Sequence, residues 1–185
     1  CYVTKYINNK LAIDTYNLPS LALINQSDIQ VAVNLTDVDD KLTWFFPYVK
    51  YGDEDICYIF GRGYNPISQV MTYNSTSSVF TSFISGWGTD RCDSFLYDYA
   101  DNYCAIRSTG LVSKLLYNGV LKLTLPFSGG VNPHSMKFGY YNELYICVDN
   151  PEPITVIRVP HPYTSYGNIT LNHEVDEGVW AIEVL

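Results

Sequence analysis

Charged residues are scarce in this chain, and basic residues are the scarcest. Only 16% of the 185 residues are charged, and 11 basic residues stand against 19 acidic ones, which gives a formal net charge of −8. The lysines and arginines are spread singly along the chain, so no basic face is predicted that would neutralise the phosphates of a nucleic acid. We therefore expect no direct nucleic-acid binding by this domain.

Long apolar runs are missing as well. No stretch reaches the roughly 18 consecutive apolar residues of a membrane-spanning helix, and no basic segment followed by an apolar one marks a signal peptide. Apolar residues still make up 47% of the chain, which is enough for a hydrophobic core. We expect one domain over residues 1–185 and no membrane span.

The chain is rich instead in strand-length apolar segments that are separated by turn residues. The clearest lie in the second half, in Val112–Tyr117, 120–125, Leu144–Val148 and 154–159. Apolar and polar side chains alternate in 121–125 and Leu144–Val148, whereas 154–159 is apolar on both faces except for Arg158, which suggests a more central strand. Between the first two, Asn118-Gly119 predicts a two-residue type I′ hairpin, because both positions need positive φ. The alternative is a short helix over 111–117 that ends at Gly119.

The whole pattern predicts an all-β fold with little helix. About eight to ten short strands at close spacing are typical of an antiparallel two-sheet sandwich, here of jelly-roll type. Earlier candidates include residues 29–33 and Val79–Ile84, and the tail contributes alternating residues from Ile169 to Val184. Pro126 is expected to stop or bulge its strand. Residues 90–103 fit an ordered loop or a short helix, and no internal repeat is evident.

No catalytic, cofactor or metal signature stands out, so we expect no enzyme. The three histidines, His134, His161 and His173, are expected to be structural or exposed. Asp37, Asp39 and Asp40 form a short acidic loop, for which a solvated turn is favoured over a calcium site because calcium needs six or more oxygen ligands.

The cysteines and glycosylation sequons point to different compartments. Five cysteines are an odd number and none has metal-binding spacing, which favours free thiols such as a buried Cys147. Cys92 and Cys104 are the candidates for a disulfide if the compartment is oxidising. Four sequons would carry glycans if the chain is secreted; they begin at Asn25, Asn34, Asn74 and Asn168.

The 17 tyrosines exceed the number that one core needs. Several lie in predicted loops: Tyr64, Tyr73, Tyr140, Tyr141, Tyr163 and Tyr166. Tyrosine joins apolar area to a polar tip, which suits interfaces. Tyr64, Tyr73, Tyr163 and Tyr166 are therefore predicted surface contacts, and ordinary packing inside the sandwich is the alternative.

The order of features over residues 118–160 resembles the last strands of a jelly-roll capsid protein of picorna-like viruses. Leu125-Pro126-Phe127-Ser128 matches a strand-ending motif of that family, residues 129–138 match an irregular loop, and Leu144–Val148 and 151–159 match the last two strands. Gly52-Asp53-Glu54-Asp55-Ile56 with Arg62 also resembles a segment of insect picorna-like subunits.

This resemblance implies a structural protein of a non-enveloped icosahedral virus, either a shell subunit or a protruding surface domain, that acts in assembly and host attachment. Its partners would be other capsid or surface subunits, in a homo- or hetero-oligomer, and a host receptor. It would assemble in the host cytoplasm and reside in the virion. The alternative is a secreted or viral-envelope β-sandwich glycoprotein domain, extracellular or on the virion surface, that binds a glycan or a protein receptor.

Overall fold

The computed structural model describes residues 1–7, 10–28, 44–62, 70–87, 90–109, 112–128, 133–148 and 155–170. These residues form β-strands and no helix, and every recorded strand pair is antiparallel. The predicted all-β, sandwich-like antiparallel fold is confirmed. Over these residues no helix has the length and apolar character that crossing a membrane would need.

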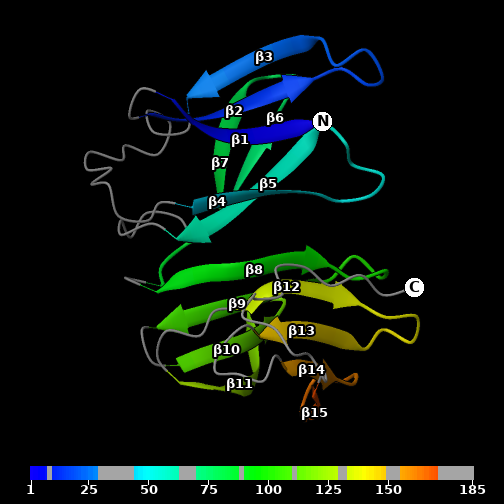
Figure 1. The fold of residues 1–185 in the computed structure, drawn as a ribbon. Coiled ribbons are helices and arrows are strands. Elements are labelled where there is room, and N and C mark those ends of the chain that lie inside the picture. The colour runs from blue at the N-terminus through cyan, green and yellow to red at the C-terminus, as the bar shows by residue number, and fades with distance from the viewer. Residues whose placement is uncertain are drawn as a thin grey trace. The chain divides into compact units, whose positions relative to one another are not determined.

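The strands form four sheets that follow one another along the chain (Figure 1). The first sheet holds β1 (Tyr2–Ile7), β2 (Lys10–Tyr16) and β3 (Leu23–Asp28), and the second holds β4 (Trp44–Val49), β5 (Ile56–Arg62), β6 (Val70–Asn74) and β7 (Val79–Ile84). The third holds β8 (Arg91–Tyr97), β9 (Tyr103–Thr109), β10 (Val112–Tyr117) and β11 (Val120–Ser128), and the fourth holds β12 (Pro133–Phe138), β13 (Leu144–Val148), β14 (Thr155–Val159) and β15 (Gly167–Thr170).

Each sheet is a meander, because every strand pairs with the strand before or after it in the sequence. A jelly roll is built from Greek keys, in which strands distant in sequence lie side by side. Such pairings do not occur among the described strands, so the predicted jelly-roll strand order is not found there. Short turns favour this outcome, since they return the chain directly onto the strand it has just left.

The chain divides into two compact units, Cys1–Arg91 and Cys92–Leu185. The first unit holds β1–β7 and the second holds β8–β15. The single sandwich domain over residues 1–185 stays a prediction.

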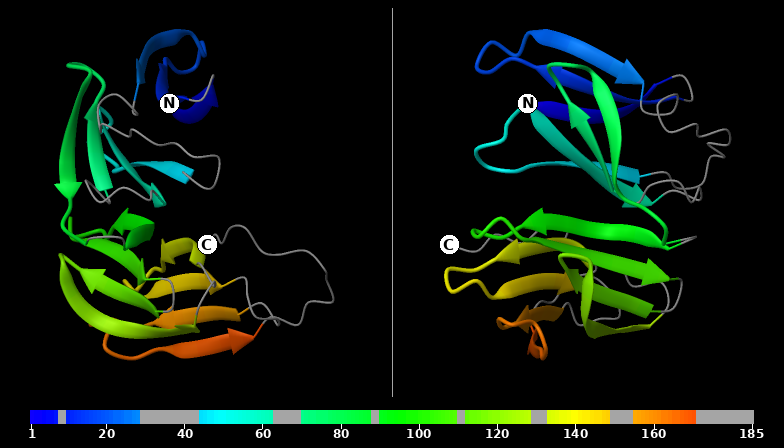
Figure 2. Two further views of the ribbon diagram at one scale, coloured as in Figure 1. Left: turned by 90° about the vertical axis from the view of Figure 1, so that its left-hand side faces the viewer. Right: turned by 180° about the vertical axis from the view of Figure 1, so that it is seen from behind.

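In the first unit, buried side chains from both sheets form a hydrophobic core. Figure 2 shows these two sheets, one in blue and the other in cyan to green. The buried members of the core are Ile13 from β2, Cys57 and Ile59 from β5, and Met71 and Tyr73 from β6. The Tyr73 hydroxyl accepts a hydrogen bond from Asn25 Nδ2 at 3.2 Å and shares another with Ser27 Oγ at 2.9 Å, both from β3. The aromatic ring fills the core while its polar tip ties β3 to β6.

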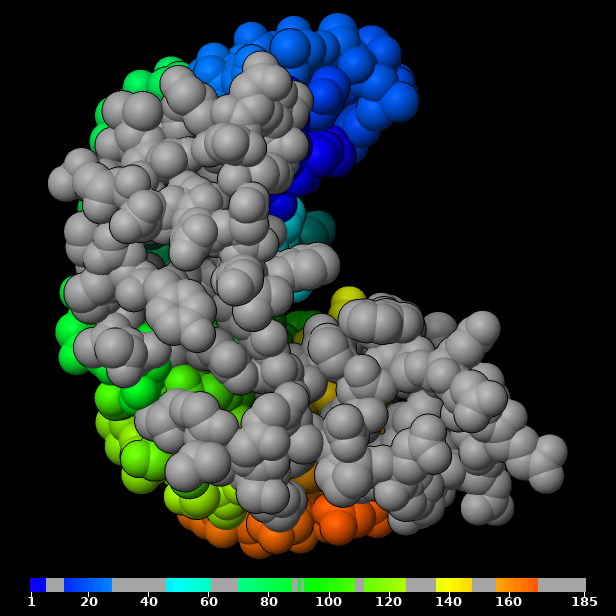
Figure 3. Space-filling model, turned by 60° about the vertical axis from the view of Figure 1, so that its left-hand side comes forward, coloured from blue at the N-terminus to red at the C-terminus, as the bar shows by residue number. Residues whose placement is uncertain are grey.

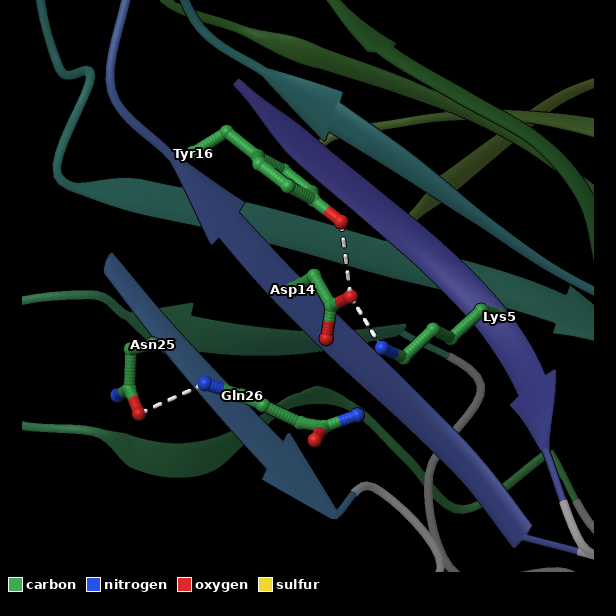
Figure 4. A network of polar contacts seen from close by, with 5 residues as sticks. All are labelled: Lys5, Asp14, Tyr16, Asn25 and Gln26. Carbon is green, nitrogen blue, oxygen red and sulfur yellow. Dashed lines mark hydrogen bonds and ion pairs between the residues drawn. The ribbon is translucent and has the colours of Figure 1, made fainter. Parts of the chain in front are cut away.

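A buried carboxylate fixes the β1–β2 hairpin (Figure 4). Asp14 is almost completely buried and accepts hydrogen bonds from Lys5 Nζ and from the Tyr16 hydroxyl at 3.1 Å. The bond to the carboxylate stabilises the neutral phenol, so the pKa of Tyr16 is raised. A slip of one residue would move Asp14 to the other face, away from Lys5, so the pair specifies the register of the hairpin.

Local turn predictions are confirmed in the second unit. Asn118 and Gly119 have φ of 48° and 77°, and Tyr117 pairs with Val120, as a type I′ hairpin requires. The helix considered over 111–117 is therefore wrong. Pro126 lies in β11, an edge strand, and the ladder with β10 shifts register between the Thr124 and Ser128 pairs, which confirms the expected bulge.

Other predicted segments differ from the structure or lie outside the described residues. The stretch 90–103, for which a loop or a short helix was expected, contains strand β8 and the turn that follows it. Residues 133–138, expected to be part of an irregular loop, form β12. The strand predicted at 29–33, the acidic residues 37–40 and the tail from 171, with His173, lie outside the described residues.

We predict that Tyr73→Phe destabilises the protein by about 1–2 kcal/mol, because Asn25 and Ser27 lose their buried partner while the ring stays in place. Urea denaturation measures the free energy of unfolding. Tyr51→Phe, at an exposed turn position, is the matched control and should change stability by less than about 0.5 kcal/mol. Equal stabilities of the two variants would contradict a stabilising role for the hydrogen bonds between Tyr73 and strand β3.

Candidate functional site

Four turns lie at one end of the second unit and contact one another. They are the β8–β9 turn (98–102), the β10–β11 turn (118–119), the β12–β13 turn (139–143) and the segment 160–166 between β14 and β15. Figure 1 shows the β8–β9 and β12–β13 turns at the same end of this unit. Side-chain contacts link the β8–β9 turn to the β10–β11 turn, Tyr117 beside that turn to Tyr163, and Tyr163 to the β12–β13 turn.

Asp98 organises the first of these turns. Its buried carboxylate accepts hydrogen bonds from the backbone N–H groups of Ala100 and Asn102, both at 2.8 Å, and from the Tyr117 hydroxyl at 2.6 Å. Burial alone would raise the pKa of Asp98, but these hydrogen bonds together outweigh it and hold the pKa below its ordinary value. Asp98 is therefore a stable anion at neutral pH that locks the turn.

Asn118 joins the β10–β11 turn to the β8–β9 turn. Its Nδ2 donates to Asn102 Oδ1 at 2.8 Å, and its Oδ1 accepts from the Tyr103 N–H at 2.9 Å. The next residue, Gly119, has positive φ, and a Cβ there would lie 3.1 Å from the Tyr103 hydroxyl oxygen. The Asn-Gly pair thus supplies both the backbone conformation and the contact between turns.

Tyr163 joins the two sheets of this unit. Its ring centroid lies 5.0 Å from that of Tyr117 and 6.4 Å from that of Phe138, and its hydroxyl donates to Asn142 O at 3.0 Å. The side chain is fully buried, so the prediction of Tyr163 as a surface contact is wrong. Burial is also the main reason that the pKa values of Tyr163 and Tyr117 are raised, which keeps both phenols neutral.

The β12–β13 turn is built around a second buried carboxylate. Glu143 accepts hydrogen bonds from the Tyr141 N–H at 2.8 Å and from the Tyr145 hydroxyl at 3.2 Å. Hydrogen bonds, first from its own backbone N–H, lower the pKa of Glu143. A Cβ on Gly139 would lie 2.8 Å from Glu143 Cδ, so the turn admits only glycine at that position without rearrangement.

This framework presents exposed tyrosines, which we call the turn surface: Tyr99, Tyr140, Tyr141 and Tyr166. Tyr99, Tyr140 and Tyr141 are 79%, 86% and 80% exposed, and Tyr166 is 41% exposed. Asp98 and Glu143 accept hydrogen bonds from the backbone N–H groups of Ala100 and Tyr141 in these turns. The rings of Tyr140 and Tyr141 pack edge to face, with centroids 5.1 Å apart. Rigid aromatic groups on ordered turns suit recognition, since little conformational entropy is lost when they bind.

The outcome for the predicted surface tyrosines is mixed. Tyr166 is exposed, Tyr73 and Tyr163 are buried, and Tyr64 lies outside the described residues. Tyr73 was predicted at the surface because a loop was assumed around it, whereas it lies in strand β6. Tyr99 was not among the predicted surface tyrosines, although the Asp and Asn residues beside it are typical of turns and indicate an exposed position.

The described sequons differ in how their asparagines are used. Asn25 Nδ2, the atom that would carry a glycan, donates to Tyr73 and to Ser78 Oγ at 2.5 Å. Asn74 Oδ1 accepts from the Ser77 N–H at 2.8 Å. Asn168 is exposed on β15, and Asn34 lies outside the described residues. Asn168 is thus the described sequon most accessible for modification.

The structure holds Cys92 and Cys104, the candidates for a disulfide in an oxidising compartment, as free thiols. Both are buried in the second unit, Cys92 in β8 and Cys104 in β9. A bridge between them under oxidising conditions stays a prediction.

The thiols other than Cys1 are buried, as expected for Cys147. Burial raises the pKa of Cys57 to about 12 and also raises the pKa values of Cys92 and Cys104. Because the thiolate is the reactive form, these groups are inert in the folded protein. The described part of the chain holds no cluster of three or more metal-ligating side chains.

Two further features have no functional assignment. The ring of the exposed His161 lies 5.2 Å from that of Tyr163, and His134 belongs to strand β12. The β2–β3 turn and the start of β3, visible in blue in Figure 3, expose four aliphatic side chains: Leu18, Leu21, Leu23 and Ile24. Nothing in the structure shows what covers this apolar tip.

We predict that Asp98→Asn destabilises the protein by about 1–3 kcal/mol at pH 7, because the strong charge-assisted bonds to the turn are lost. The folded-state pKa of Asp98 lies below the unfolded value, so its contribution is complete above the unfolded pKa and disappears as the pH falls through the folded one. The stability difference from wild type should therefore narrow between pH 5 and about pH 3, measured by urea denaturation.

Asp101→Asn is the control for this experiment. Asp101 is exposed in the same turn and has a left-handed backbone that asparagine also tolerates. Its substitution should change the free energy of unfolding at pH 7 by less than about 0.5 kcal/mol. A stability difference for Asp98→Asn that stays constant with pH would contradict the role given to the carboxylate.

We also predict that one thiol, Cys1, reacts promptly with a thiol reagent in the folded protein, since the others are buried. All five should react after denaturation without reductant. The number of reacting thiols is measured from the absorbance of the thiolate that an aromatic disulfide reagent releases. A count of three in denaturant would instead reveal one bridged pair.

Comparison with known proteins gives this chain no family. No protein-family model matches the sequence, and no curated protein matches it significantly. The case for function therefore depends on the turn surface and on the framework that holds it.

Proposed function

We propose that this chain is a non-catalytic recognition domain that attaches to a host receptor through the turn surface of its second unit. The observation that carries the proposal is that Tyr99, Tyr140 and Tyr141 are exposed on turns whose backbones are fixed by buried Asp98 and Glu143. Tyrosine is enriched among residues that dominate binding energy. Loops held by a rigid scaffold are also the usual location of binding residues.

The wider setting that we propose is a viral structural protein, in which this chain is a surface or protruding domain. The resemblance over residues 118–160 supports a viral origin, and the turn surface supports attachment. A shell-forming jelly-roll subunit is the less supported form, since the described strands pair in meanders. The alternative, a secreted or envelope glycoprotein domain, draws support from the exposed sequon at Asn168.

Among the described residues, the lack of an activated cysteine or of a carboxyl group suited to acid catalysis favours binding over catalysis in this proposal. Burial raises the pKa values of the thiols of Cys57, Cys92 and Cys104, which disfavours the reactive thiolate. Neither buried carboxylate of the turns, Asp98 or Glu143, has a pKa raised toward neutrality, which a general acid would need. Both are instead acceptors for backbone and phenolic donors.

The test labels this protein with a fluorescent dye and measures its binding to a panel of cultured insect, mammalian and plant cells by flow cytometry. We predict saturable binding to at least one cell type and a loss of at least roughly tenfold in affinity for the Tyr99→Ala/Tyr140→Ala double variant. Thermal unfolding should stay within about 2 °C of wild type, because both rings are exposed.

Val79→Ser replaces an exposed apolar side chain in the first unit and serves as the control, with affinity equal to wild type. The proposal fails if wild-type protein binds no cell type in the panel. It also fails if the double variant binds as tightly as wild type.

A further inference from the structure

Strand β7 of the first unit is an edge strand that differs from the other described edge strands. One side of an edge backbone is open to pairing, so proteins commonly place charged residues, prolines, bulges or very short strands there. The four sheets have two edge strands each, and six of these contain a charged residue or a proline: β1, β3, β4, β8, β11 and β12. The edge strand β15 has neither but is only four residues long. β7, VFTSFI, has six residues with neither, and its ladder with β6 is regular from Val79 to Ser82.

The surroundings of β7 in the sequence are uncharged as well. Residues 63–89 contain no Asp, Glu, Lys or Arg, although 16% of the whole chain is charged. The strand is also accessible, since Val79 and Phe83 are 52% and 38% exposed and Thr81 between them is exposed. Its valine, isoleucine, threonine and phenylalanine residues all favour strands. An exposed, uncharged edge of this kind is suited to the addition of another strand.

The side chains of β7 that would meet an added strand divide between two faces. Phe80 packs against the core of the first unit. Val79 and Thr81 therefore point away from that core, and so does Phe83, whose ring lies 5.3 Å from that of Tyr58 and makes an edge contact with it. The face turned away from the core thus presents valine, threonine and phenylalanine in that order, with threonine at the centre.

This face is complementary to a second copy of itself. Antiparallel pairing about a two-fold axis perpendicular to the sheet keeps each face on its own side, so odd-numbered residues lie opposite odd-numbered ones. With the axis at Thr81, this residue lies opposite Thr81 of the second copy, and Val79 lies opposite Phe83 of that copy. Threonine pairs and pairs of an aromatic with a β-branched residue both stabilise antiparallel strands.

Charge favours the same occupant. The chain has a net charge of −8, so most contacts between two copies would bring like charges together. β7 avoids this repulsion because neither it nor the chain on either side of it carries a charge. A strand of another protein would need its own matching side chains, whereas a second copy provides the match by symmetry.

We infer that β7 is a homodimer contact, at which a second copy of this chain adds its own β7 in antiparallel orientation about a two-fold axis at Thr81. Pairing occupies the open edge of both copies. Pro47 in β4, at the other edge of the sheet, has no N–H to donate to a further ladder, so the assembly closes at two copies. The contact lies within the first unit and does not depend on the proposed receptor contact.

The experiment is sedimentation equilibrium of the full chain at concentrations from roughly 1 to 300 μM. Each copy contributes one strand of six residues, and interfaces this small are weak and transient. We predict a dimer with a dissociation constant of roughly 10–100 μM. Cell-binding measurements at nanomolar protein therefore report on the monomer.

Two charge variants test the position of the axis. Thr81→Lys and Thr81→Glu each place two like charges opposite each other, so each should weaken the dimer by roughly tenfold or more. An equal mixture of the two variants brings opposite charges together and should restore dimers of about wild-type affinity. Thr81 is exposed, so each variant alone should unfold within about 2 °C of wild type.

Thr76→Lys is the matched control, since it adds the same charge in the exposed turn between β6 and β7. It should change the dissociation constant by less than about twofold. A chain that stays monomeric over the whole concentration range overturns the inference, and so does a Thr81→Lys variant that dimerises like wild type. A mixture that fails to dimerise overturns the axis at Thr81, and assembly beyond two copies overturns the closed dimer. None of these results bears on the proposed receptor contact, which the cell-binding assay tests by itself.

Discussion

The buried carboxylate of Asp98 is the constraint on which the binding end of the second unit depends. A buried charge is tolerated only when hydrogen bonds replace its water, because leaving it unsatisfied costs several kcal/mol. Asp98 meets this requirement with two backbone donors of its own turn and the hydroxyl of Tyr117. Each donor is thereby fixed in place, so one anion positions two turns at once.

The consequence spreads through aromatic side chains. Tyr117, held by Asp98, contacts Tyr163, and the Tyr163 hydroxyl reaches the backbone of Asn142 in the β12–β13 turn. Polar and aromatic contacts therefore link the two sheets of this unit at the end where these turns lie. Tyr73 has the same function in the first unit, where Asn25 and Ser27 bind its hydroxyl. Tyrosine suits this position because its ring fills a core while its hydroxyl still finds a partner.

The sequence predicted those features that depend on local chemistry. Two-residue alternation located β11 and β13, strand-length apolar runs located β10 and β14, and Asn118-Gly119 specified the turn between β10 and β11. Alternation failed for β8, because Asp93 and the aromatic residues around it mix polar and apolar character on both faces. It also says nothing about strand partners, which is why a jelly-roll order was inferred where meanders occur.

The candidate site was harder to predict than the fold, for a physical reason. Whether a tyrosine is buried depends on a partner for its hydroxyl, and those partners come from distant segments, as Asn142 does for Tyr163, 21 residues away in the chain. Tyr163 and Tyr140 therefore look alike in the sequence, since both stand in turn-rich segments.

Burial of the thiols also changes the argument about compartment. An odd cysteine count weighs against secretion only if the free thiols are reactive, since unpaired reactive thiols form unwanted bridges in an oxidising environment. Cys57, Cys92 and Cys104 are buried and their pKa values are raised, so they resist oxidation wherever the protein resides. Cysteine parity therefore no longer separates a cytoplasmically assembled subunit from an extracellular domain, and the exposed Asn168 sequon becomes the more informative feature.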